Sequence, residues 1–234
     1  MTMSRLAGAA ALAFVPVAAA ATGILRSAGL PATSAGPAEV AAFYAGQPIS
    51  VGIASALAPL AWLLLVLFGA GAVGRLRPAE AAQGEAWSLV GLAGIVMQNV
   101  LFAGSVAAQI ALLAGAPAGG GLWQLHNALF SLNGIALAIA MLGFSISGLR
   151  TGTLAGWHVT VGLVAATLQL ISSALTPVSL SGGPAGFALV GLVGFLLWLV
   201  WLVTFGVVLL REPTPDGRRY RGASPSTTSA ASSA

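Results

Sequence analysis

The amino-acid sequence predicts an all-α protein, a polytopic bundle of six transmembrane helices with its N- and C-termini in the cytoplasm. Of its 234 residues, 58% are hydrophobic and only 6% are charged, and the mean hydropathy is +0.96. A water-soluble globule of this length needs more polar surface than that. The chain also contains six apolar runs near the roughly 20 residues that cross a bilayer. They cover approximately residues 6–25, 51–73, 87–114, 122–149, 154–175 and 187–210.

The distribution of arginines predicts the orientation of these spans. With a cytoplasmic N-terminus, only Arg26 falls outside, and the other eight basic residues are inside: Arg5, Arg75, Arg77, Arg150, Arg211, Arg218, Arg219 and Arg221. Cytoplasmic loops of membrane proteins carry an excess of Lys and Arg. Adding or removing one interior span would destroy this asymmetry. The expected location is the inner (plasma) membrane.

The first run allows two interpretations. "MTMSRLAGAAALAFVPVAAAATG" has a basic start, an apolar centre and small residues near Ala18 to Ala21 that resemble a signal-peptidase site. The apolar run nevertheless continues to Leu25, which is long enough to span a bilayer. A retained helix is the favoured interpretation, and cleavage would leave five spans.

The segment 26–50 is the longest external connection. Within it, "PAEVAAFY" begins with proline and places Val40, Phe43 and Tyr44 on one helical face. We expect a short helix at the outer interface, and a lid over a binding site is the alternative.

Polar residues outside the spans carry little chemistry. In the cytoplasmic loop "RLRPAEAAQGEAW", Glu80 and Glu85 are expected to pair with nearby arginines. Residues 1–211 form the predicted membrane domain. Residues 212–234 are rich in small polar residues and predict a disordered cytoplasmic tail, whose arginines would contact anionic lipid headgroups.

The composition excludes several functional classes. The absence of cysteine removes disulfides, thiolate metal sites and thiol redox chemistry. The sequence pI of 11.2 does not indicate nucleic-acid binding, because the arginines stand singly or in small groups between apolar runs. There is no GxSxG motif, no HExxH pair and no acidic residue in the central part of any span.

Amides, hydroxyls and imidazoles are the polar groups left inside the spans. Gln98 and Gln109 are eleven residues apart, His126 and Asn133 are seven apart, and His158 and Gln169 are eleven apart. Such spacings place each pair on one helical face. Folding the hairpins back places Gln109 near the level of His126, and both Asn99 and Gln169 near the level of Asn133. The resulting candidate ligand-binding residues are Gln98, Asn99, Gln109, His126, Asn127, Asn133 and Gln169.

Two interpretations of these polar stripes stay open. In the favoured one, the amides hydrogen-bond across helices, each contact contributing about 0.6 kcal/mol and at most about 2. The small-residue pairs Ala70 with Gly74 and Gly104 with Ala108 would let the backbones approach. In the other, the stripes line a polar cavity that opens outward at His126 and Gln109.

The two histidines raise the possibility of a haem. His126 is near the outer end of its span and His158 near the inner end of the next, so at 1.5 Å per residue they are roughly 30 Å apart. One iron cannot bridge that distance within a subunit. No metal or cofactor is therefore expected.

Four segments carry a resemblance to a known kind of protein. They are the external "PAEVAAFYAGQPISVGI", the "GAVGRLRP" after the second span, the "SGLRTGTLAGW" between the fourth and fifth, and the final "VVLLRE". With these segments the chain resembles six-span integral membrane proteins of actinobacteria, of the domain-of-unknown-function type, over most of residues 1–212. The resemblance implies the same topology. It supplies no catalytic residues, since that family has no established activity.

The sequence thus favours a non-enzymatic membrane protein. The first hypothesis is a structural, interaction or regulatory subunit whose partners are membrane lipids and another membrane protein, with no nucleic acid. The alternative is a small transporter or binding protein for an uncharged or lipid-like ligand, held in a polar cavity between the third, fourth and fifth spans.

Overall fold

The computed structural model describes residues 2–180 and 187–211. Within these ranges the regular structure is helical. The helices are α1 Met3–Ser27, α2 Pro37–Gly46, α3 Pro48–Ala82, α4 Trp87–Leu113, η1 Ala118–Gly120, α5 Leu122–Arg150, α6 Gly156–Ala174, α7 Thr176–Leu180 and α8 Phe187–Leu210. The predicted tail lies outside the described residues.

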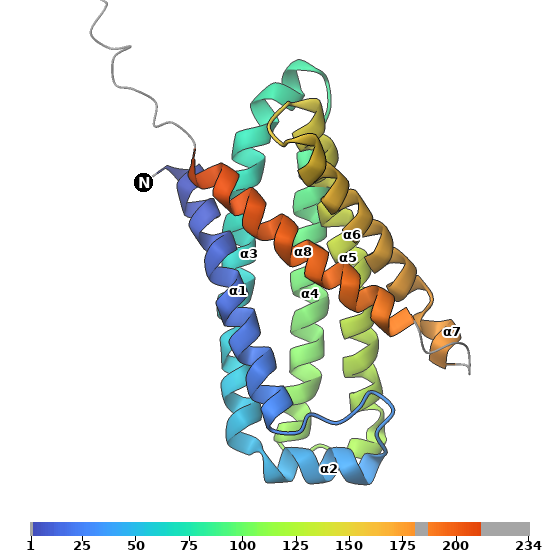
Figure 1. Ribbon diagram of the computed structural model, residues 1–234. Coiled ribbons are helices and arrows are strands. Elements are labelled where there is room, and N and C mark those ends of the chain that lie inside the picture. Colours follow the sequence, from blue (N-terminus) through green and yellow to red (C-terminus); the bar gives the residue numbers. More distant parts are fainter. Residues whose placement is uncertain (1, 181–186, 212–234) are drawn as a thin grey trace, which may run out of the picture.

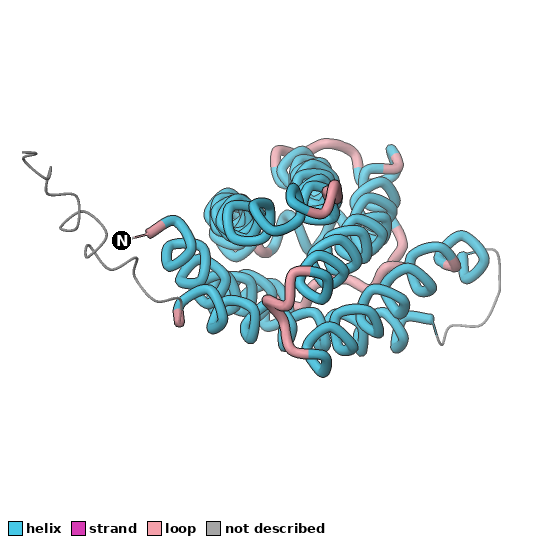
Figure 2. Tube along the Cα trace, turned by 90° about the horizontal axis from the view of Figure 1, so that it is seen from above, coloured by secondary structure: helices cyan, strands magenta, loops and turns pink. Residues whose placement is uncertain are grey.

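The prediction of six membrane-spanning helices is confirmed. α1, α3, α4, α5, α6 and α8 are each long and apolar enough to cross a bilayer, with the fifth span counted from Gly156 to Val178. They close into a ring in which α3 packs on α4, α4 on α5, α5 on α6, α6 on α8, α8 on α1, and α1 on α3. Figure 1 shows α8 crossing the bundle at a steep angle and α2 lying across one end. Figure 2, which looks along the bundle, shows the neighbouring helices side by side.

α3 is longer than the predicted second span. It runs for 35 residues from Pro48 to Ala82, roughly 50 Å at 1.5 Å per residue, against a hydrocarbon core of about 30 Å. The apolar run ends at Val73, and the extra turns carry Arg75, Arg77 and Pro78. The helix therefore extends out of the apolar layer, beyond the boundary that hydropathy alone indicated.

An aromatic core fills the ring of helices where α8 crosses it. Phe68, Phe144, Trp201 and Phe205 form this core; all four are fully buried. Phe68 meets Phe144, Trp201 and Phe205 edge-on at centroid distances of 5.9, 6.1 and 5.4 Å, a favoured geometry for aromatic pairs. Trp198 of α8 is buried as well.

The closest helix contacts occur at glycines. A methyl group at Gly94 of α4 would come within 2.3 Å of the backbone nitrogen of Ala140 in α5, and one at Gly71 of α3 within 2.2 Å of the Cβ of Ala7 in α1. The predicted close approach at Gly74 is wrong, because nothing lies within 4 Å of that position. Gly71, three residues before Gly74, is the glycine that meets α1. Gly74 itself is exposed.

The start of α1 and the end of α8 lie at the same end of the bundle (Figure 1). The Ser4 hydroxyl donates a hydrogen bond to the carbonyl oxygen of Leu209, with an oxygen–oxygen distance of 3.3 Å. This arrangement agrees with an even number of spans. We refer to this end, which also carries the α3–α4 and α5–α6 loops, as the arginine end, and to the other as the α2 end.

Candidate functional site

His126 in α5 is tied to Ser105 of α4. Its Nδ1 lies 2.8 Å from Ser105 Oγ and 3.0 Å from the Ser105 carbonyl oxygen. The imidazole also stacks on Trp123, with ring centroids 5.0 Å apart and planes 12° from parallel, and lies 6.4 Å from the Phe130 ring. Both faces of the ring therefore meet aromatic side chains, and its orientation is fixed.

Gln109 does not contact His126, although folding the α4–α5 hairpin back had placed the two residues at about the same level. It is buried and lies beside the phenol of Tyr44 in α2. Burial raises the pKa of Tyr44 to about 12, although the neighbouring Gln109 side chain acts to lower it. The Tyr44 hydroxyl is buried and makes no hydrogen bond of normal geometry. The hairpin estimate was wrong by about one helical turn, because the residue opposite His126 is Ser105.

The α2 end of this polar stripe is covered. The predicted helix is confirmed as α2, with Val40, Phe43 and Tyr44 buried, and Tyr44 packs edge-on against Trp123 at 6.4 Å. The loop before α2 is held down by Trp123 Nε1, which donates to the Ala32 carbonyl at 3.3 Å. The expected opening at His126 and Gln109 therefore lies beneath α2 and its loop. The short helix packs on the end of the bundle.

Asn127 belongs to this cover and not to the interior. Its Nδ2 donates to the Thr33 carbonyl at 3.5 Å, so its role here is to hold the loop that precedes α2. Of the seven candidate residues, it is therefore the one that bonds the loop before α2.

Gln98 and Asn133 face one another across the α4–α5 interface. Gly91, Gly94, Gln98 and Ser105 recur at helical spacing on one face of α4, and Gly94 and Ser105 contact Ala140 and His126 of α5. His126, Asn133 and Ala140 are likewise seven residues apart on α5. The antiparallel register between these contacts places Gln98 opposite the turn of α5 that contains Asn133.

The oxygens of these two amides have no donor. Gln98 is 5% exposed and Asn133 8%, and both Gln98 Oε1 and Asn133 Oδ1 are buried without a hydrogen-bond partner. An unsatisfied buried acceptor costs about 1–3 kcal/mol, and no bulk water is present in a bilayer core to replace the partner. The two amide oxygens are therefore acceptors left without a donor inside this interface.

Asn99 and Gln169 lie near this level, but Asn99 bonds α3 and Gln169 reaches α5 from α6. Asn99 Nδ2 donates to the Trp62 carbonyl of α3 at 3.1 Å, while its Oδ1 is buried without a donor. A methyl group at Gly134 would come within 3.0 Å of Gln169 Oε1 and 2.1 Å of Ser173 Oγ, so Gln169 packs against α5 beside Asn133. We call Gln98, Asn99, Asn133 and Gln169 the amide layer.

Ser105 and Ser88 were not among the predicted site residues. Ser105 is fully buried and bonds His126; its place seven residues after Gln98 was the signal that could have identified it. Ser88 bonds Glu80, whose carboxylate accepts from the Ser88 backbone N–H at 2.7 Å and from the Ser88 hydroxyl. Glu80 thus caps the start of α4 and also interacts with the charge of Arg77, while Glu85 pairs with Arg150 at 2.7 Å.

The two histidines serve different helix interfaces. His158 Nε2 lies 2.9 Å from the Trp201 carbonyl of α8, whereas His126 joins α5 to α4. Among the described residues, no group of three or more His, Cys, Asp or Glu side chains could hold a metal ion.

Comparisons with known proteins found no match. No protein-family model, no curated protein and no solved structure matched this chain.

Proposed function

We propose that the protein is a non-enzymatic, multi-pass protein of the plasma membrane that binds or transports a small uncharged or lipid-like molecule at the amide layer. The observation that carries this proposal is the pair of buried oxygens, Gln98 Oε1 and Asn133 Oδ1, on facing helices without a donor. Two acceptors and no neighbouring ion favour a neutral guest with hydroxyl or amine hydrogens.

α2 fits the role of a cover for this site. It lies over the same α4–α5 edge, attached through Tyr44 and Trp123 and through a small apolar cluster separate from the main core. A ligand would reach the amide layer by passing beneath α2 or by entering from the lipid between helices.

Native mass spectrometry of the purified protein tests the proposal. The wild type is expected to retain a neutral small molecule, or to take up monoolein or glycerol as probes, while the double variant Gln98→Leu/Asn133→Leu does not. The variant should fold at least as well, because it removes two unsatisfied polar groups. Equal masses and equal probe binding in both proteins would refute the proposal, as would a map in which the two amides bond only to each other or to water.

A structural or interaction subunit is the second candidate. The observation in its favour is the α2-end half of α1, where Ala19, Ala20 and Gly23 are exposed and nothing lies within 4 Å of Gly23. Small residues allow close approach of a second transmembrane helix. A membrane protein that co-purifies at a fixed stoichiometry, and is lost in Ala20→Leu/Gly23→Leu, would favour this role over ligand binding.

A further inference from the structure

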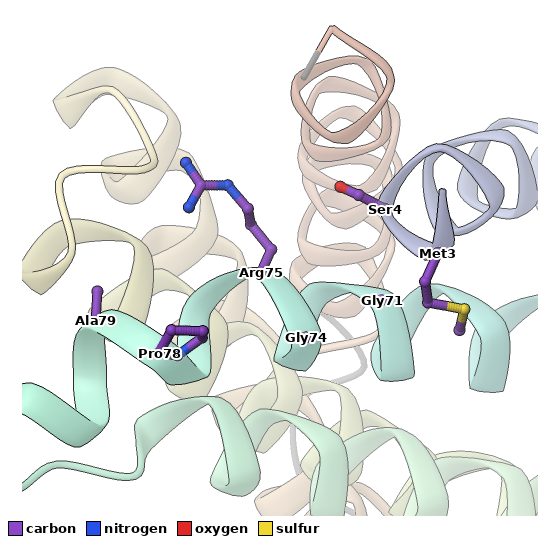
Figure 3. A pocket seen from close by; sticks show the side chains of 7 residues that line it. All are labelled: Met3, Ser4, Gly71, Gly74, Arg75, Pro78 and Ala79. Atoms are coloured by element: carbon purple, nitrogen blue, oxygen red, sulfur yellow. The ribbon is translucent and has the colours of Figure 1, made fainter. Parts of the chain in front are cut away.

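A cavity lies between α1 and α3 at the arginine end of the bundle, beside their contact at Gly71 and Ala7. It has a volume of about 410 Å³ and is lined by Met3 and Ser4 of α1 and by Gly71, Gly74, Arg75, Pro78 and Ala79 of α3. Figure 3 shows the Ser4 and Arg75 side chains on the same side of α3, and Gly71 and Gly74 on the α3 backbone. The cavity shares no residue with the amide layer, whose Asn99 meets α3 at Trp62, more than two helical turns from Gly71.

The cavity straddles the boundary between apolar and polar sequence. The apolar run of α3 ends at Val73, and Arg75 follows on the next turn. Met3 and Gly71 therefore lie on the apolar side, and the Arg75 guanidinium lies on the polar side. An amphiphile whose charged group sits at the membrane surface matches this division.

The excess of arginines at this end of the bundle favours the binding of an anion. Among the described residues, five arginines lie here (Arg5, Arg75, Arg77, Arg150 and Arg211) against two glutamates. Glu80 is engaged by Ser88 and Glu85 by Arg150, so the two carboxylates already have partners. The α2 end carries one arginine and one glutamate, Arg26 and Glu39. The difference gives the arginine end a positive field that the other end lacks.

The two glycines have different effects on this cavity. A methyl group at Gly71 would strike Ala7 at 2.2 Å, so Gly71 brings α1 and α3 together. At Gly74 a side chain would meet nothing within 4 Å, so that position remains open space. The cavity is thus bounded by a fixed helix contact on one side and left unfilled on the other.

We infer that this cavity binds an anionic phospholipid, with the phosphate at Arg75 and the start of an acyl chain over Gly71, Gly74 and Met3. Arginine pairs favourably with phosphate oxygens, and the glycines leave room for the chain. The Ser4 hydroxyl is committed to Leu209; it fixes α1 against α8 and is a positioning group for the wall.

The test compares lipid binding by variants that leave the helix contacts intact. Purified protein in detergent is titrated with phosphatidylglycerol and, separately, with phosphatidylcholine, and bound lipid is counted by native mass spectrometry. Arg75→Gln is expected to weaken phosphatidylglycerol binding about fivefold, the effect of one arginine near a membrane surface. Gly74→Leu should abolish the tight site by filling the cavity. Arg26→Gln, which removes one positive charge at the other end, should bind like the wild type.

Circular dichroism and size-exclusion chromatography of each variant separate lost binding from lost folding. Gly74→Ala, with the smallest side chain that reduces the cavity, provides a milder variant if Gly74→Leu fails to fold. Binding of phosphatidylcholine as strong as phosphatidylglycerol would overturn the inference. So would unchanged binding in both Arg75→Gln and Gly74→Ala, or displacement of the lipid by millimolar inorganic phosphate, which has no acyl chain.

Discussion

At the scale of single residues, Gly94 sets the distance between α4 and α5. A Cβ there would lie 2.3 Å from the Ala140 backbone nitrogen and 2.8 Å from the Ala136 carbonyl oxygen. Backbone atoms cannot move aside as a flexible side chain can. Gly94→Ala is expected to destabilise the bundle by about 1–3 kcal/mol, the usual cost of overpacking. Unfolding with a denaturing detergent measures the change.

Gly52 supplies the matched control for that substitution. It also lies within a long helix, α3, but nothing approaches its Cβ position within 4 Å. Gly52→Ala should leave stability unchanged or raise it slightly, because alanine is the better helix former. Equal losses in both variants would show that the α4–α5 backbones are not in contact at Gly94.

Tyr44 provides a second test at the residue scale, through its titration. Burial raises the pKa of Tyr44 to about 12 from the ordinary value of 10. The folded state therefore favours the neutral phenol, and its contribution to stability is complete below pH 10 and is lost as the pH rises from 10 to 12. Ultraviolet absorbance should show one tyrosine ionising late in the folded protein. Tyr44→Phe should remove this late transition, and its persistence in the variant would assign it elsewhere.

At the scale of elements, α1 is an integral part of the ring. It packs on both α3 and α8, with Gly8 close to Gly206 and Gly71 close to Ala7. Pro16 lies inside the helix, yet α1 continues to Ser27. Phe14 of α1 belongs to the same buried apolar core as Leu65 and Phe68 of α3.

Retention of α1 in the mature protein is the prediction that follows. N-terminal sequencing of protein purified from membranes should begin ahead of α1 and not within it. Deleting residues 1–27 is expected to abolish folding, because the apolar faces of α3 and α8 lose their neighbour. Sequencing that begins near residue 22, in a protein that stays folded, would favour cleavage as a signal peptide.

Helix positions could be read from the sequence far better than helix contacts. Hydropathy located all six spans, and the last matches α8 residue for residue, because length and apolar content decide whether a segment spans a membrane. The end of α3 was missed because a helix can continue past the apolar layer without any hydrophobic signal. The level of Gln109 was misjudged because the bend of a hairpin shifts register by several residues. Which small residues touch, such as Gly71 and not Gly74, depends on helix rotation, which composition does not encode.

At the scale of the whole molecule, the sequence likewise predicted only part of the candidate site. The amide positions on α4 and α5 followed from helical spacing, and the facing of Gln98 and Asn133 required the register fixed by Gly94 and Ser105. The cover formed by α2 depends on contacts between Tyr44 and Trp123, which lie far apart in sequence. Membership in the actinobacterial six-span family stays a prediction.

The orientation of the ring in the membrane is the last prediction, and the absence of native cysteine makes it directly measurable. Single cysteines can be placed at exposed loop positions: Ser34→Cys and Ala114→Cys at the α2 end, Ala82→Cys and Ala155→Cys at the arginine end. Because positive charge is retained on the cytoplasmic side, a membrane-impermeant maleimide should label the first pair on intact cells and the second pair only after permeabilisation. All four substituted residues are small, so folding should be unaffected. The reverse pattern would place the arginine end outside and would require the phospholipid of the proposed cavity to come from the outer leaflet.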